Sequence, residues 1–298
     1  MAALNDNSNH DQRPFFPDQK GHFSAVDRYQ NLEEISRGSY GVVRRARDKK
    51  TGDIVAIKEE FHGMSESTKR EISILRSLPR HRSIVEFRDA IVDDCDRVFV
   101  VMEYVDNDLD RLMATKPRPF TVNGVKVAVR QILEGVAFLH DHGIMHRDIK
   151  PSNILVNNKT AKLKLCDFGL SRHCWSESGA YTPRVVTQCY RAPELLMGAN
   201  VYSYAIDVWS VGCIMAELVL GHVLFVGRSE IQQLRCIYRI MGARGCLLRT
   251  MVAAAAVFRD APSLSALGFD LLESLLACDP NRRIAARDAL NHAWFTEF

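Results

Sequence analysis

The chain has 298 residues, of which 47% are hydrophobic and 25% are charged, and its formal net charge is +3. These values are ordinary for a folded globular protein and exclude the low hydrophobicity and high net charge of a disordered chain. Because 39 basic residues face 36 acidic ones, there is no broad basic field, and we expect no nucleic-acid partner.

Several cellular locations are disfavoured by the sequence. Its longest apolar run, residues 251–258, is far shorter than the roughly 20 residues of a membrane helix, so we expect no membrane association. The first residues lack the apolar core of a secretory signal. None of the eight cysteines forms a Cys-x-x-Cys pair, which is typical of thiols in a reducing compartment. We therefore expect an intracellular protein, in the nucleus, the cytoplasm or both.

The first third of the chain is predicted to be rich in β-strands. Residues 1–28 show no apolar periodicity, and we expect a disordered tail there. From Tyr29 onwards one helix is predicted over residues 65–78, with Ser65 as its N-cap. Short β-like runs surround it, at residues 42–46, 53–58, 84–87 and 97–102.

The rest of the chain is predicted to be mainly helical. Apolar residues recur at helical spacing from Val125 to Leu139, with Gly143 as a stop signal, and residues 207–220 form a nearly apolar helix before Gly221. Two short strands, at residues 154–156 and 163–166, lie between these helices. The pattern predicts an α+β chain with a β-rich lobe over residues 29–105, a helical lobe over residues 106–298 and a cleft between them.

A glycine-containing turn joins two strand-like segments at residues 36–43, SRGSYGVV. Gly38 and Gly41 have no Cβ, so backbone N–H groups there can approach phosphate groups. An ordinary glycine hairpin is the alternative interpretation. Because a strand follows the turn, a dinucleotide-binding βαβ unit does not fit.

A lysine and a glutamate form the second candidate feature. In the strand-like sequence VAIK, residues 55–58, alternation places Ala56 and Lys58 on one face. Lys58 there can hold nucleotide phosphates, or it can simply be a surface lysine at the end of a strand. Glu71 shares a helix face with the apolar Leu75, and a buried carboxylate needs a partner. Lys58 is the natural candidate for that partner.

The most specific motifs are HRDIKPSN at residues 146–153 and DFG at residues 167–169. Asp148 can accept a proton from a hydroxyl nucleophile, and Lys150 can neutralise a transferring phosphoryl group. Asn153 and Asp167 carry the hard oxygen atoms that Mg²⁺ prefers. Together the two motifs resemble those of eukaryotic protein kinases, and the resemblance extends over residues 29–298.

Further motifs resemble one group within that family. Residues 180–194 and 224–230, and the STKRE sequence at residues 67–71, are similar to cyclin-dependent kinases. The sequences YTP at residues 181–183 and HAWF at residues 292–295 resemble most closely the plant G-type and the eleven-type members. Glu194 and Arg283 match an ion pair that closes the activation segment in the family.

The resemblance implies a bilobal kinase fold and ATP- and Mg²⁺-dependent phosphorylation of serine or threonine in proteins. In that mechanism Asp148 orients and deprotonates the acceptor hydroxyl and Lys150 stabilises the phosphoryl group. Asn153 and Asp167 hold Mg²⁺. The resemblance also implies an ATP site that contains the Lys58–Glu71 pair. The other residues that line this site are Ile35, Ser36, Gly38, Gly41, Val43, Ala56, Met102, Glu103, Val105 and Leu155.

Regulation by phosphorylation is also implied by the resemblance. Thr182 matches the activating site, and Arg70, Arg147 and Arg172 match three arginines that gather its phosphate. Three unrelated surface arginines are the alternative. Tyr40 matches the inhibitory tyrosine of the glycine turn, although a purely structural tyrosine would also fit.

The substrate implied by the resemblance is a protein with a Ser-Pro or Thr-Pro sequence. Val185, Val186 and Arg191 match the pocket that selects the proline. A cyclin is the implied partner.

The sequence departs from the family pattern at four places. Ser36 replaces the first glycine of the turn, so we expect weaker ATP binding. Glu71 lies only 13 positions after Lys58, so the segment that leads into the helix bound by cyclins is shorter than is usual in the family. Gln188 and Cys189 stand where the family has an apolar residue and tryptophan. Residues 243–262 are short and unlike the family, which predicts exposed apolar surface or lost docking sites. The alternative function is therefore a kinase-fold scaffold with weak or no catalysis.

Overall fold

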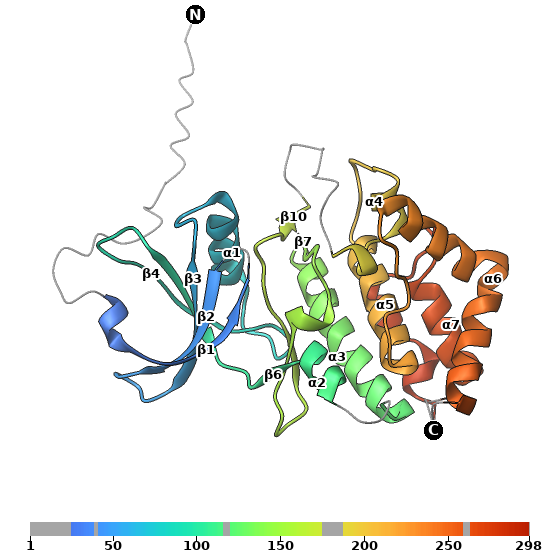
Figure 1. The fold of residues 1–298 in the computed structure, drawn as a ribbon, viewed down its shortest axis with the longest axis horizontal. Coiled ribbons are helices and arrows are strands. Elements are labelled where there is room, and N and C mark those ends of the chain that lie inside the picture. The colour runs from blue at the N-terminus through green and yellow to red at the C-terminus, as the bar shows by residue number, and fades with distance from the viewer. Residues whose placement is uncertain (1–24, 39–40, 116–119, 175–186, 259–262, 298) are drawn as a thin grey trace, which may run out of the picture.

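The computed structural model describes residues 25–38, 41–115, 120–174, 187–258 and 263–297. A β-sheet with one helix forms the N-terminal part of these residues, and a bundle of helices forms the C-terminal part beside it (Figure 1). The expected α+β, bilobal kinase architecture is confirmed.

The N-terminal lobe is built on a five-stranded antiparallel sheet in the order β1-β2-β3-β5-β4. Apolar side chains on one face of this sheet form a small core of their own, which includes Val55, Ile57 and Val101. The strands are β1 (Tyr29–Arg37), β2 (Gly41–Asp48), β3 (Ile54–Glu60), β4 (Phe87–Val92) and β5 (Val98–Glu103).

Helix α1 (Glu66–Ser77) begins at the predicted N-cap. The side chain of Ser65 accepts the N–H of Thr68 at 3.2 Å, which satisfies one of the free donors of the first turn. Ile72 and Leu75 of this helix are buried, and so is the charged Glu71. The apolar stripe therefore fixes the rotation of the helix, and that rotation carries Glu71 inwards.

Two predicted boundaries in this lobe are wrong. The predicted strand at residues 84–87 is absent except for Phe87, where β4 starts, and Ile84 makes a single parallel bridge to Leu165. The apolar residues at 84 and 85 are buried because they connect the two lobes, with the Val85 N–H donating to Leu165 O at 2.9 Å. Residues 25–28, which were expected to belong to a disordered tail, form a 3-10 turn.

This turn is held to the sheet by an ion pair between Arg28 and Asp48. The guanidinium donates to the two carboxylate oxygens at 2.8 and 2.5 Å, and the backbone carbonyl of Arg28 accepts the N–H of Lys49 at 2.9 Å. Hydrogen bonding from Arg28 lowers the pKa of the Asp48 carboxyl to about 2. The pair therefore fastens both ends of the β1–β2 hairpin to one another.

We expect this ion pair to make stability depend on pH in acid. A carboxyl whose pKa is lower in the folded state stabilises the protein above its unfolded pKa of about 3.9, and that stabilisation is lost as the pH falls towards about 2. Asp48→Asn should flatten this part of the profile in urea unfolding measured from about pH 5 to about pH 2, whereas Asp53→Asn, at an exposed aspartate nearby, should leave it unchanged. The same acid slope in Asp48→Asn would contradict the assignment.

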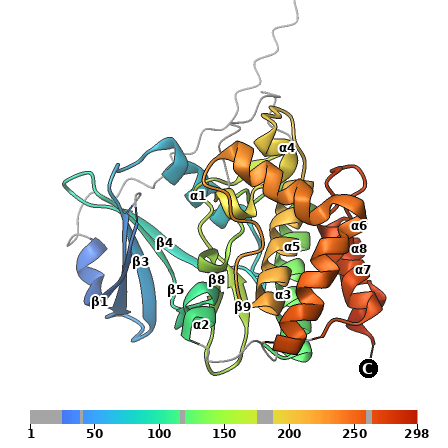
Figure 2. The ribbon, with the colours of Figure 1, turned by 45° about the vertical axis from the view of Figure 1, so that its right-hand side comes forward.

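The C-terminal lobe is organised around helix α5 (Ala205–Leu220), which packs against α3 (Val122–Asp141) and α7 (Ala266–Leu275) (Figure 2). Helix α5 is buried along nearly its whole length and ends at Gly221, which adopts a left-handed conformation with φ of 72°. Its Gly212 allows close packing, because a Cβ there would lie 2.8 Å from Leu276 Cδ2.

Short elements complete this lobe. The strands are β6 (Asn107–Asp108), β7 (Ile144–Met145), β8 (Ile154–Val156), β9 (Leu163–Leu165) and β10 (Arg172–His173). The other helices are α2 (Leu109–Thr115), α4 (Pro193–Leu196), α6 (Glu230–Phe258) and α8 (Ala286–Leu290), with 3-10 turns at Pro151–Asn153, Gln188–Tyr190 and Ala293–Phe295.

Helix α6 covers most of residues 243–262, the segment that was expected to be unlike the family. This helix has 29 residues and continues through residue 258. Leu248 and Val252 are at most 1% exposed and belong to the main core. This segment therefore supplies core side chains, while Leu247 beside them stays 39% exposed. Among the helices that the structure describes, none combines the length and the apolar character needed to span a membrane.

Candidate active site

A cavity of about 210 Å³ lies between the β-sheet and the C-terminal lobe. At one end it is apolar, with Val43 and Ala56 from the sheet and Leu155 from β8, and at the other end it is charged, with Lys58 and Asp167. The predicted nucleotide-site residues that line it, beside these, are Ile35, Ser36, Met102, Glu103 and Val105. An apolar slot that leads to a few charged groups fits a flat base with phosphates attached.

The two glycines of the turn have different positions. Gly38 lines a neighbouring cavity of about 280 Å³, together with Lys58, Asp148 and Lys150. Gly41 lies in the sheet, where a Cβ would be 2.2 Å from the backbone oxygen of Glu59. Strand packing therefore excludes a side chain at Gly41. This requirement for glycine is independent of phosphate binding.

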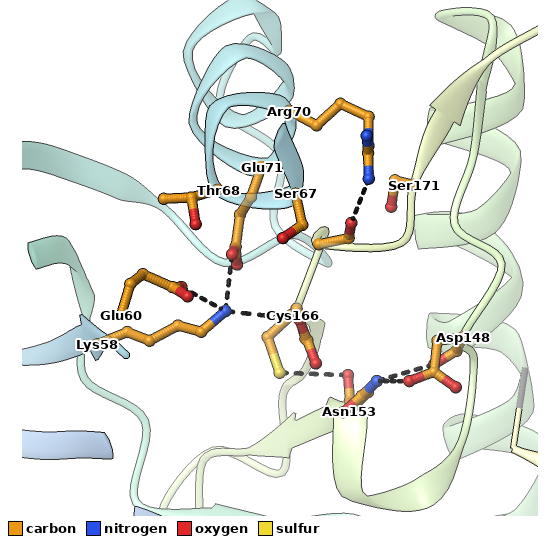
Figure 3. A network of polar contacts seen from close by, with 12 residues as sticks. Lys58, Glu60, Ser67, Thr68, Arg70, Glu71, Asp148, Asn153, Cys166 and Ser171 are labelled. Carbon is orange, nitrogen blue, oxygen red and sulfur yellow. Dashed lines mark hydrogen bonds and ion pairs between the residues drawn. The ribbon is translucent and has the colours of Figure 1, made fainter. Parts of the chain in front are cut away.

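Lys58 and Glu71 form the predicted ion pair. Lys58 Nζ lies 2.7 Å from Glu71 Oε2 (Figure 3). It also lies 3.8 Å from Asp167 Oδ1. Burial by itself lowers the pKa of the Lys58 ammonium, but the carboxylates of Glu71 and Asp167 outweigh it and raise that pKa. Burial also raises the pKa of the Glu71 carboxyl, and the Lys58 charge opposes this. The pair thus holds a permanent cation at the charged end of the cavity.

The catalytic-loop residues converge on Asp148. Its Oδ2 accepts hydrogen bonds from Lys150 Nζ at 2.7 Å and from Asn153 Nδ2 at 3.1 Å, and its Oδ1 accepts the Thr187 hydroxyl at 3.2 Å. Three donors around one carboxyl fix its orientation. Thr187 was not among the residues predicted for the site, because no local motif shows that the segment around residue 187 lies beside Asp148.

Asp207 supports this loop from α5. Its carboxylate accepts the backbone N–H groups of His146 at 2.9 Å and Arg147 at 2.8 Å, and His140 at 3.0 Å. Burial alone raises the pKa of Asp207, but these hydrogen bonds, led by that from His140, reverse the shift and lower it. Arg147 has a φ of 67°, a strained value for a residue with a side chain, so the loop needs such an anchor.

The three predicted phosphate-gathering arginines lie near one another. Arg147 donates to Leu170 O at 2.7 Å and to the Tyr202 hydroxyl at 2.6 Å, and Arg70 donates to Gly169 O at 3.3 Å. Burial is the main cause that lowers the pKa of Arg70, and repulsion from Arg172 and Arg147 adds to it.

Two ion pairs brace the region around residues 187–196. Arg283 donates to both carboxylate oxygens of Glu194, at 2.7 and 2.9 Å, and both side chains are buried. Arg191 Nη1 lies 2.8 Å from Glu230 Oε1 at the start of α6. The remaining predicted residues Tyr40, Thr182, Val185 and Val186 lie outside the described residues.

Sequence reasoning missed an arginine at the mouth of the cavity. Arg111 of α2 donates to the backbone oxygen of Ile35 at 3.0 Å and lies 3.2 Å from Asp108. It therefore links the first strand of the N-terminal lobe to the first helix of the other lobe. No local sequence signal identifies a bond between residues 76 positions apart.

Comparison with known proteins agrees with this geometry. The protein kinase domain family model matches residues 29–295. Similar curated proteins include cyclin-dependent kinase G-1 of Oryza sativa subsp. indica, 46% identical over 301 residues, cyclin-dependent kinase G1 of Arabidopsis thaliana, 42% over 306, and cyclin-dependent kinase 11A of Homo sapiens, 42% over 294.

These alignments cover 92% of this chain but 43%, 50% and 37% of the three relatives. The chain thus spans half or less of the length of these curated proteins. The domain match covers nearly all of the described residues, and the similarity to the relatives extends through both lobes. The chain therefore belongs to the protein kinase domain family.

Proposed function

We propose that this chain transfers the γ-phosphoryl group of ATP to serine or threonine hydroxyls of proteins, with a preference for sites followed by proline. The observation that carries the proposal is the convergence of the Lys58–Glu71 ion pair and the Asp148 cluster on adjoining cavities. In this proposal the protein acts inside the cell, in the nucleus or the cytoplasm.

The chemistry of two side chains fits a Mg²⁺ ion. Asp167 offers carboxylate oxygens, and Asn153 donates through its amide nitrogen to Asp148, which leaves its amide oxygen for a cation. Both residues line the cavity beside Lys58. The bound ion supplies charge neutralisation for the phosphates, and these two residues are proposed to hold it.

The remaining steps are assigned to side chains of this chain. Lys58, held by Glu71, binds nucleotide phosphates. Asp148 accepts the proton of the acceptor hydroxyl as the new O–P bond forms and the bond from the γ-phosphorus to the bridging oxygen breaks, releasing ADP. Lys150 stabilises the charge on the transferring group. Thr187 fixes the rotation of the Asp148 carboxyl from the opposite side.

Proline direction and activation are proposed from the regulatory residues. Arg191, Val185 and Val186 are assigned to the pocket for the proline. Phosphorylated Thr182 is assigned as the partner of Arg70, Arg147 and Arg172, and the mutual repulsion of the arginines around Arg70 supports a dianionic ligand between them. A cyclin is the proposed protein partner, although the short segment between Lys58 and Glu71 offers a cyclin fewer residues to contact.

The scaffold alternative has weaker support. It rests on the two segments that are unlike the family, residues 58–71 and 243–262. Across the first of them the Lys58–Glu71 pair is closed, and part of the second belongs to the core. Neither departure removes a charged group from the proposed site.

A paired-peptide experiment tests the proposal. The chain, phosphorylated at Thr182 and assayed with and without a cyclin, should phosphorylate a Ser-Pro peptide at least about tenfold faster than the matched Ser-Ala peptide. Equal rates on the two peptides would overturn proline direction. Incorporation no faster than that of an Asp148→Asn variant would overturn the enzymatic function, and ATP binding without turnover would then favour the scaffold.

A further inference from the structure

Lys58 has a second close carboxylate, that of Glu60. Because side chains alternate along β3, residues 58 and 60 lie on the same face of the strand, while Glu59 lies on the opposite face. Lys58 Nζ lies 2.9 Å from Glu60 Oε1 and 2.7 Å from Glu71 Oε2. Figure 3 shows the two carboxylates reaching the ammonium group from the strand and from α1. The ammonium is therefore held between two acids.

The two contacts differ in quality. Lys58 donates a hydrogen bond to Glu71, whereas Glu60 Oε1 is buried and has no hydrogen-bond donor among the described residues. The contact with Glu60 is thus close in distance but poorly aligned, and it acts through charge alone. The side chain of Glu60 is only 6% exposed, so water screens this attraction weakly.

The charges at this end of the cavity do not balance. The carboxylates of Glu60, Glu71 and Asp167 lie within 4 Å of the single ammonium of Lys58. Glu60 also lines the cavity of about 280 Å³ that contains Asp148 and Asp167. A nucleotide phosphate that approaches Lys58 therefore meets a carboxylate that holds the same ammonium and repels the phosphate.

We propose that Glu60 is a positioning residue that competes with nucleotide phosphates for Lys58 and so weakens the binding of ATP and ADP. This inference rests on the proposed nucleotide site. Glu71 suffices to orient Lys58, since it makes the aligned hydrogen bond. Glu60, by contrast, attracts the ammonium towards the end of β3. A phosphate that binds Lys58 must therefore displace the contact between Lys58 and Glu60.

Glu60→Gln tests the inference because it removes the charge and keeps the size of the side chain. The dissociation constant for ADP should fall about three- to tenfold, and that for adenosine, which has no phosphate, should not change. The KM for ATP should fall by a similar factor at unchanged kcat, because Lys58 contacts the phosphates before and during transfer.

Glu59→Gln is the matched control. Glu59 is the neighbouring acid on the same strand but pairs with Arg44 and lies 3.8 Å from Arg97, on the face away from Lys58. Its substitution should leave ADP affinity unchanged. Glu60→Leu is a second variant without the charge, and thermal unfolding identifies any variant that fails to fold.

The outcomes separate this inference from the proposed function. If the wild-type chain binds neither ATP nor ADP, the nucleotide site itself is wrong. If it binds ADP and neither Glu60 variant binds more tightly, the competition by Glu60 is overturned. Equal tightening for ADP and adenosine would also overturn it, because that result indicates a general change of the cavity.

Discussion

Replacing Asp148 by asparagine is expected to lower kcat by about 10²- to 10⁴-fold, the range typical for loss of a general base. The carboxylate accepts hydrogen bonds from Lys150, Asn153 and Thr187, so every nearby donor is arranged for a negative acceptor. An asparagine amide must turn its NH₂ group towards one of these donors, and it cannot accept the proton of a hydroxyl at neutral pH.

The binding of ATP should survive this substitution, because Asp148 does not line the cavity that contains the apolar adenine slot. Single-turnover phosphoryl transfer and ATP affinity, measured on the same preparations, test both statements. Asp110→Asn, at an exposed aspartate of α2, is the control and should leave kcat unchanged. A kcat for Asp148→Asn within about twofold of the wild type would contradict the assigned role.

Local motifs predicted the catalytic side of the site from sequence. Asp148, Lys150 and Asn153 lie within six consecutive residues, so one loop conformation brings them together. The Lys58–Glu71 pair was also predictable, because strand alternation and helix periodicity each assign one partner to an inward face. In both cases the information lies in short-range geometry.

Other features depend on contacts between distant segments and could not be predicted in this way. Asp207 reaches the catalytic loop from 60 residues further along the chain, and Arg111 reaches Ile35 across the cavity. The error at residues 84–87 has the same origin, since their burial comes from the bridge to Leu165. An apolar run shows that a segment is buried, but it does not identify the element that covers it.

Helix α6 shows a different limit. Residues 243–262 were expected to be unlike the family, and no helix was predicted there. Leu248 and Val252 are nonetheless four residues apart and both buried, which is the spacing of one helix face. This spacing is therefore a local helix signal that sequence reasoning missed.

The largest effect on stability is expected from Arg283→Ala. The Arg283 side chain is fully buried, donates to both oxygens of Glu194, and also donates to the backbone oxygens of Ala277 and Ala205. Its removal leaves the Glu194 carboxylate, which is 10% exposed, without its counter-charge. Breaking one partner of such a pair costs about 3–5 kcal/mol, a large share of the roughly 5–15 kcal/mol that stabilise a typical protein.

Urea unfolding of three variants can separate this cost from the general loss of an arginine. Arg287→Ala is the control, because Arg287 pairs with Asp141 at the exposed surface and its loss should cost far less stability than Arg283→Ala. The double variant Glu194→Leu with Arg283→Met removes both charges and should be more stable than Arg283→Ala alone. If the double variant is the less stable of the two, the cost arises from lost packing and backbone contacts of Arg283, such as its position 5.1 Å from the ring centre of Trp209, and not from the stranded carboxylate.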